Sequence, residues 1–357
     1  MTKFLHGKLN ALRTAFIIGL IFILVVTAGS LVFIHNLYGE NFPRYDKPKY
    51  SGRLQFSDVP GYSHSVVHFP SGKNSLTGFI FGEDNTKGLV VIAPGRGEGV
   101  EYYLAEILFF VDQGWRVLSF DYTGSYTSEG ENSVGLPQSR IDLEAALAYI
   151  QNDDTLNNLP LFLCGHSWGG YAVAAVLQED SKISAVASVS GFNSPQELMD
   201  EYVRKQIGSL GFVLYPFEWI YQTLRFGCSA GASAVDSINR SGVPVMIVHG
   251  SADDDISYDG ASIIAHRGQI TNAGVVYKSC SAKNHDGHKD LLLSEAAVQY
   301  INQKNQEYQT LFDRYDGTIP DSARTEFYAG VDRFQTSEPD VDLMNAINHF
   351  FESALLD

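Results

Sequence analysis

The stretch Leu163–Gly170, LCGHSWGG, places a serine between two glycines at the spacing GxSxG, directly after a run of apolar residues. At the glycine and serine frequencies of this chain, such a spacing arises by chance in roughly one sequence in four, so the motif alone is weak. Its setting adds information. A strand that turns sharply into a helix would strain Ser167, and Gly165 and Gly169 lack the side chains that would clash there. The sequence therefore predicts Ser167 as a nucleophile on a strand-to-helix turn.

Short β-branched and apolar runs alternate with helical patterns after residue 58. The runs predicted as strands are 65–69, 76–81, 89–93, 116–120, 161–164, 183–189, 244–249 and 275–280. Strands separated by helices of ten or more residues imply right-handed crossovers and a mostly parallel sheet. The first two strands are joined tightly and predict an antiparallel hairpin at its edge. The predicted fold class is α/β, with an eight-stranded, mostly parallel sheet and helices on both faces.

A long segment from residue 193 to about 240 breaks this alternation and is predicted to be a helical lid above the carboxyl edge of the sheet. Its aromatic residues include Phe212, Tyr215 and Trp219, which are candidate substrate-binding residues of an apolar pocket. The same residues fit equally well as packing between the lid and the body. Both interpretations stay open here.

The residues from Ala15 to Ile34 carry no charge. A helix of that length spans roughly 30 Å, the thickness of the hydrocarbon core of a bilayer. Apolar residues resume after the small residues at 28–30, which favours an uncleaved anchor over a cleaved signal peptide. The sequence therefore predicts a single-pass membrane protein.

Basic residues flank this span almost equally, so their count does not decide its orientation. A short basic tail before one span resembles a signal anchor, which predicts that the large domain lies outside the cytoplasm. The expected organisation is a tail over 1–14, an anchor over 15–36, a polar tether over 37–58 and a large domain over 59–357.

The overall charge and the cysteine pattern exclude several classes of protein. The net charge of −16 opposes binding to nucleic acid. No CxxC pair or HExxH stretch suggests a metal, and we expect no cofactor. The three cysteines do not form a disulfide framework. The oligomeric state is not indicated.

A serine hydroxyl needs a histidine base and an acid that orients it. Candidates for both the acid and the base follow Ser167 along the chain. An acidic cluster comes after the strand at 244–249, and the stretch SAKNHDGHKDLLLS comes after the strand at 275–280. With the GxSxG turn and the strand order, these patterns resemble the α/β-hydrolase superfamily from about Tyr62 to the C terminus. GHSWGGYA is also similar to the turns of dienelactone-hydrolase-like and prolyl-oligopeptidase-like members.

The resemblance implies particular partners for the serine. The family pattern HGxxDxxV aligns with His249 to Ile256 and selects Asp253 as the acid, with Asp254 and Asp255 as alternatives. The family histidine usually follows a glycine, which selects His288 over His285.

Two backbone amides are implied as oxyanion donors. One belongs to Trp168, at the start of a helix whose dipole favours negative charge. The other is expected from Arg96, with Gly97 as the alternative, in a turn that carries Pro94 and Gly95 where the family often has His-Gly. We expect the Arg96 side chain to be solvated at the surface rather than to contact a substrate carboxylate.

Other stretches depart from the family. In FDYTGSYTSEG, Thr123 stands where arginine is common and Tyr126 where glycine is common. A C-terminal extension over about 310–357 predicts one helix after Pro320 and another over 341–351, both packed on the body, with an oligomer contact as the alternative.

The implied function is a membrane-anchored serine hydrolase that cleaves an ester of a small-molecule or acyl substrate. A serine peptidase or amidase of the same fold is the alternative, and a non-catalytic binding module at the membrane is another. An inactive copy is expected to lack a triad member, whereas this chain has candidates for all three, which favours catalysis.

Overall fold

The computed structural model describes residues 2–178, 182–208 and 213–356. Its eight-stranded sheet has the order β1-β2-β4-β3-β5-β6-β7-β8. The strands are β1 (His64–Ser71), β2 (Asn74–Phe81), β3 (Leu89–Ala93), β4 (Arg116–Phe120), β5 (Leu161–His166), β6 (Ile183–Val189), β7 (Val245–Gly250) and β8 (Val275–Cys280). The β1–β2 and β2–β4 pairs are antiparallel and the remaining pairs are parallel. The predicted α/β class is confirmed.

Burial explains the composition of the strands. Every residue of β3 and of β7 is buried, as expected for parallel strands covered on both faces and built from continuous apolar runs. The strand β8 at one edge alternates between partly buried and exposed residues. The central strands therefore form a rigid platform, and their carboxyl ends carry the turns that follow them.

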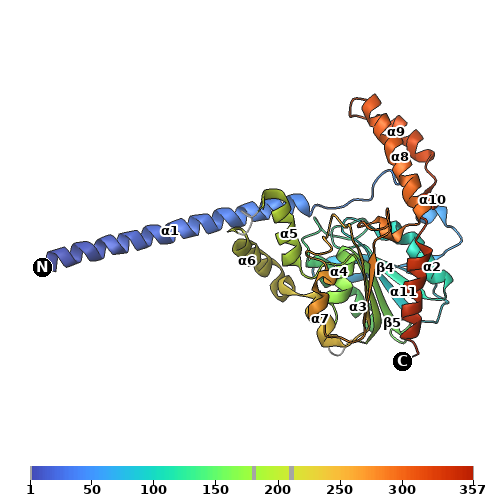
Figure 1. Ribbon diagram of the computed structural model, residues 1–357, viewed down its shortest axis with the longest axis horizontal. Helices are drawn as coiled ribbons and strands as arrows, with labels where there is room; N and C mark the ends of the chain where they lie inside the picture. Colours follow the sequence, from blue (N-terminus) through green and yellow to red (C-terminus); the bar gives the residue numbers. More distant parts are fainter. Residues whose placement is uncertain (1, 179–181, 209–212, 357) are drawn as a thin grey trace.

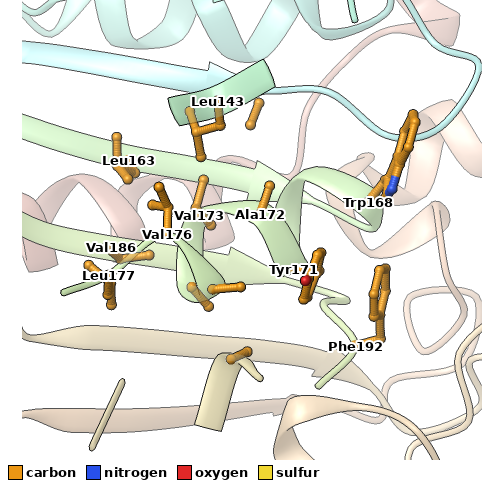
Figure 2. Packing of buried hydrophobic residues seen from close by; sticks show 14 of the residues in the cluster. Leu143, Leu163, Trp168, Tyr171, Ala172, Val173, Val176, Leu177, Val186 and Phe192 are labelled. Atoms are coloured by element: carbon orange, nitrogen blue, oxygen red, sulfur yellow. The ribbon is translucent and has the colours of Figure 1, made fainter. Parts of the chain in front are cut away.

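Helices cover both faces of the sheet (Figure 1). One core contains residues of α3 (Gln138–Asn152), α4 (Trp168–Ala175) and α7 (Ala234–Ser241). The opposite core contains residues of α2 (Leu104–Asp112) and α11 (Val341–Ser353). Figure 2 shows the first core, where Ala172 and Val173 of α4 gather with Leu143 and Leu163. This packing holds the start of α4 at the end of β5.

The lid predicted between β6 and β7 contains α5 (Pro195–Ile207) and α6 (Tyr215–Phe226). Ser194 caps α5 by accepting a hydrogen bond from the backbone N–H of Glu197, and a proline occupies the first turn. The two helices lie on the side of the body from which α1 (Thr2–Asn41) projects (Figure 1).

Helix α1 is long and apolar enough to cross a membrane over Leu12–Asn41, and its apolar side chains are exposed. It is one continuous helix whose last part enters the body, where Ile34, Tyr38 and Phe42 are buried. The predicted tether therefore contributes to the helix and to the core. After the helix, the Arg44 guanidinium donates hydrogen bonds to three carbonyl oxygens of the loop 126–130, so this segment lies against the body.

One part of the C-terminal region projects from the body and another part packs on it. Helices α8 (Glu295–Arg314) and α9 (Asp321–Ala329) project from the body, followed by the short α10 (Arg333–Thr336) (Figure 1). Helix α9 has no buried residue and contacts α8 through Phe327, whose ring lies 5.0 Å from that of Tyr308. Helix α11 instead buries Leu343, Met344, Ile347 and Phe351. Packing on the body was thus predicted correctly for α11 and wrongly for α9.

Candidate active site

Ser167 lies at the tight turn between β5 and α4, with φ of 57° and ψ of −113°. A Cβ atom at Gly165 would lie 2.3 Å from the Gly169 carbonyl oxygen, and one at Gly169 would lie 1.9 Å from that of Ala93. Such distances are far inside contact range, so both positions require glycine. The turn presents a partly exposed Ser167 at the carboxyl edge of the sheet.

His288 links Ser167 to Asp253. Its Nε2 atom lies 2.8 Å from Ser167 Oγ and its Nδ1 atom lies 2.8 Å from Asp253 Oδ2. A neutral imidazole has one donor and one acceptor nitrogen. A proton on Nδ1 donates to the carboxylate, which leaves Nε2 to accept the serine hydroxyl proton. Three residues that follow different strands thus meet in one hydrogen-bonded line.

Asp253 is buried and holds its charge through hydrogen bonds. Its Oδ1 atom accepts the backbone N–H groups of Asp255 and Ile256 at 3.0 and 2.8 Å. Burial raises its pKa, but hydrogen bonds from His249, His288 and Ile256 outweigh burial and hold the pKa well below its ordinary value. The carboxylate is therefore ionised at neutral pH.

The alternative acid and base residues lie elsewhere. Asp254 is exposed, and the Asp255 carboxylate is 63% exposed with its Oδ2 atom 3.9 Å from His288 Nε2. His285 has its Nδ1 atom 3.7 Å from Asp340 Oδ2. The structure brings Asp253 and His288 to Ser167, as expected from the sequence.

Two backbone amides are the expected oxyanion donors. Trp168 is the first residue of α4, where a helix offers its N–H no internal acceptor. In the turn after β3, the Gly95 N–H already donates to the Tyr103 hydroxyl at 2.9 Å. The Arg96 N–H is the next along the turn, and Gly97 follows with φ of 74°.

The family model described as serine aminopeptidase, S33, matches residues 84–216. The esterase Pf2001 of Pyrococcus furiosus superposes with a TM-score of 0.52 at 15% identity, covering 75% of this chain and 98% of that one. The chain has the α/β-hydrolase fold. The region matched by the family model includes Ser167 and Arg96 and ends before Asp253 and His288. The finer placement among proteins of this fold stays a prediction.

Other solved enzyme structures are also similar. Est1E from Butyrivibrio proteoclasticus, solved with ferulic acid, has a TM-score of 0.48 at 18% identity, covering 68% of this chain and 98% of that one. The acylaminoacyl peptidase of Pyrococcus horikoshii has a TM-score of 0.49 at 13% identity, covering 75% of this chain and 44% of that one. No curated protein matches the sequence.

The protein has a buried polar network beside Ser167 that we did not predict. His166 Nδ1 lies 2.8 Å from the Tyr103 hydroxyl, and His166 Nε2 lies 2.8 Å from the His288 carbonyl oxygen. The Tyr103 hydroxyl also contacts Glu98, whose carboxylate pairs with Lys289 Nζ at 2.7 Å. Burial, followed by the charge of His288, lowers the pKa of His166 to about 4. A neutral His166 thus connects the oxyanion turn, the serine and the histidine loop.

The network explains why the turn after β3 has a glycine at position 95. A Cβ atom at Gly95 would lie 2.4 Å from Glu98 Oε2 and 2.8 Å from the Tyr103 hydroxyl. These two side chains therefore occupy the space beside Gly95 and hold the turn by hydrogen bonds. A side chain fills the space beside a second glycine nearby. Tyr126 has φ of 44°, and its ring occupies the space that a Cβ atom at Gly99 would need.

His249 is a second residue that sequence reasoning missed as a functional candidate. It is fully buried, and its Nε2 atom lies 3.1 Å from Asp253 Oδ2 and 2.9 Å from the Ile256 carbonyl oxygen. The only signal in the sequence is its place in the HGxxD pattern that selects Asp253.

The structure describes two of the three candidate substrate-binding residues of the lid. Phe212 lies outside the described residues, and Tyr215 is half-buried at the start of α6. Trp219 is 54% exposed, so its side chain does not line an enclosed pocket. The sequence places aromatics on a helix, but it does not reveal that Trp219 faces outward.

Proposed function

We propose that this protein is a membrane-anchored serine hydrolase that cleaves an ester through Ser167, His288 and Asp253. The observation that carries the proposal is the line of 2.8 Å hydrogen bonds from Ser167 Oγ through the His288 imidazole to Asp253 Oδ2. The strained backbone of Ser167 supports the same role, since a turn of this kind exposes a nucleophile.

The reaction would proceed through an acyl-enzyme. Ser167 Oγ attacks the ester carbonyl carbon while its proton passes to His288 Nε2. The resulting imidazolium, stabilised by ionised Asp253, returns that proton to the departing alkoxide as the carbon–oxygen bond breaks. Water then attacks the acyl-enzyme, again giving its proton to His288, and the acid is released as Ser167 recovers its hydrogen.

The backbone amides of Trp168 and Arg96 would stabilise the oxyanion of each tetrahedral intermediate. A single donor of this kind typically contributes about 3 to 4 kcal/mol to lowering the barrier. Both amides are fixed by regular structure, Trp168 by α4 and Arg96 by the turn held by Tyr103. Little reorganisation is therefore needed during the reaction.

Helix α1 would act as the membrane anchor, with the hydrolase domain outside the cytoplasm. The apolar side chains over residues 16–26 are exposed rather than buried in the body, which argues against a role as a core helix. Protease accessibility on intact cells tests the orientation. Cleavage of the domain in intact cells is expected, whereas protection that is lost only after lysis contradicts it.

A fluorophosphonate probe, which reacts with activated serines, tests the catalytic role. We expect labelling of the full chain and none of Ser167→Ala. Ser190 offers a matched control, because it follows β6 with φ of 48° and has no hydrogen-bond partner for its hydroxyl within the described residues. Ser190→Ala should still be labelled. An unlabelled wild type, or equal labelling of Ser167→Ala, would favour the non-catalytic binding module.

A serine aminopeptidase is a second candidate, because the family model that matches residues 84–216 carries that description. Rates on p-nitrophenyl esters of graded chain length and on aminoacyl p-nitroanilides separate the two activities. Hydrolysis of the esters alone is expected. A strict preference for the anilides would replace the esterase by the peptidase while leaving the role of Ser167 intact.

A further inference from the structure

Helix α6 buries two polar residues and exposes two large apolar ones, although Phe226 at its end is buried. Glu218 and Gln222 are 4% and 2% exposed, whereas Trp219 and Leu224 are 54% and 78% exposed. On the side of the helix opposite Glu218 and Gln222, five residues recur at helical spacing. We call them the outward face: Pro216, Trp219, Ile220, Thr223 and Leu224. A surface helix in water normally shows the reverse arrangement.

The buried polar pair shows that this arrangement is built into the fold. Gln222 Nε2 donates a hydrogen bond to Glu218 Oε1 inside the protein. Burial raises the pKa of Glu218 to about 8, so the carboxyl group is mostly uncharged at neutral pH. The helix thus buries this polar pair, while the opposite side carries an indole and aliphatic groups.

Helix α6 packs directly on the end of α1. The Tyr38 and Tyr221 rings are 4.8 Å apart, and His35 Nδ1 lies 3.1 Å from the Tyr221 hydroxyl. Figure 1 shows α6 beside the point where α1 leaves the body. The helix with the outward face is therefore next to the apolar span.

The depth of this contact can be estimated from helix geometry. The uncharged run ends at Ile34, and Tyr38 lies four residues later, about 6 Å along the axis at 1.5 Å per residue. The polar headgroup region on each side of a bilayer is roughly 5 to 7 Å thick. With α1 spanning a bilayer, Tyr221 lies at the depth of the headgroups.

We propose that the outward face of α6 docks on the bilayer that α1 spans, with phospholipid as its occupant. This inference rests on the anchor in the proposed function and adds a second membrane contact to it. Tryptophan favours the interface, because its ring is apolar and its N–H is polar. Arg225 is exposed beside Tyr221 and can extend its guanidinium toward lipid phosphates.

Tryptophan fluorescence in the full chain tests this docking, because Trp115 and Trp168 are buried in the body and Trp219 is exposed. The chain is reconstituted in phosphatidylcholine vesicles with or without bromine atoms on the acyl chains, which quench by contact. Bromolipid should reduce the emission of the wild type, and this loss should disappear in Trp219→Phe. Aqueous iodide should have little effect on Trp219.

Phe334 provides a matched control for an exposed aromatic. It is 58% exposed on α10, which lies on the far side of the body from α1 (Figure 1). In a Trp219→Phe background, the tryptophan placed by Phe334→Trp should be quenched by iodide and not by bromolipid.

Three results would overturn the docking. Trp219 emission that iodide quenches and bromolipid does not would place the outward face in water. Emission quenched by neither would indicate that protein covers it. A chain that does not float with vesicles would remove the anchor and the docking together. Fluorophosphonate labelling of the same samples reports separately on Ser167, so failure of the docking is distinguishable from failure of the hydrolase.

Discussion

His249 donates a hydrogen bond to Asp253, with its Nε2 atom 3.1 Å from the same Oδ2 atom that accepts from His288. Both the His249 and the Asp253 side chains are fully buried. A carboxylate with two fixed donors cannot rotate away from the imidazole that it orients. His249 is therefore expected to act as a positioning residue for the proposed triad.

Replacing His249 should reduce activity through its effect on Asp253 and not through a lost contact with the substrate. His249→Phe removes a donor from Asp253, so the pKa of Asp253 rises and its hold on His288 weakens. We expect kcat/KM to fall about 10- to 100-fold, as for other residues that orient a ligand indirectly. His249→Gln keeps an N–H donor and should recover much of the loss. Equal losses in both variants would contradict the positioning role.

Gly169→Ala should disrupt the turn that carries Ser167. The new Cβ atom would lie 1.9 Å from the Ala93 carbonyl oxygen, and backbone must move to relieve the contact. We expect destabilisation of at least about 2 kcal/mol and loss of fluorophosphonate labelling. Gly268→Ala is the control, since no atom lies within 4 Å of its Cβ position. A labelled, stable Gly169→Ala protein would refute the steric account.

Tyr103→Phe should impair the chemical step more than substrate binding. It leaves the Gly95 N–H and His166 Nδ1 without their hydroxyl partner, so the turn that presents the Arg96 amide loosens. We expect kcat to fall about 10-fold or more with little change in KM, because an oxyanion develops only in the transition state. Tyr102→Phe removes a neighbouring hydroxyl that bonds Arg53 instead and should have little effect. A rise in KM at constant kcat would point to substrate contact.

Glu106→Gln should stabilise the protein at high pH. Burial raises the pKa of Glu106 from 4.5 to about 7, so the stability it contributes in its protonated form is lost as the pH rises from about 4.5 to 7. The loss amounts to about 3 kcal/mol. Thermal unfolding should give a Tm difference between variant and wild type that grows from pH 5 to pH 8. His166 and Glu218 titrate in both proteins, so this difference isolates Glu106. A constant difference would contradict the assignment.

The sheet was predictable because its strands are short, apolar and bounded by turn residues. Every predicted strand overlaps an observed one, and the edge hairpin is antiparallel as expected. The turn at Ser167 was also predictable, since glycine spacing is visible in a sequence and the clash that it avoids is local. Asp253 and His288 follow strands whose order the resemblance implied, which explains why the structure brings them together.

Contacts between distant segments were not predictable. The network of Glu98, Tyr103 and His166 joins the segment after β3 to the end of β5, and only the folded sheet places these two segments side by side. Helix α9 was expected to pack on the body, yet its partners are Tyr308 of α8 and Tyr50 of the N-terminal segment, whose ring lies 5.4 Å from that of Tyr328. Periodicity identifies an apolar face but does not identify what covers it.

The unbroken course of α1 from its apolar span into the core has a mechanical consequence. Ile34 and Tyr38 of α1 are buried in the body, so with α1 as the proposed anchor the domain must share the tilt of that helix. A spanning helix adjusts its tilt to the hydrocarbon thickness around it. Changing that thickness would therefore tip the whole domain and alter the height of Ser167 above the lipid. Membrane thickness would thereby become a variable that acts on the proposed hydrolase.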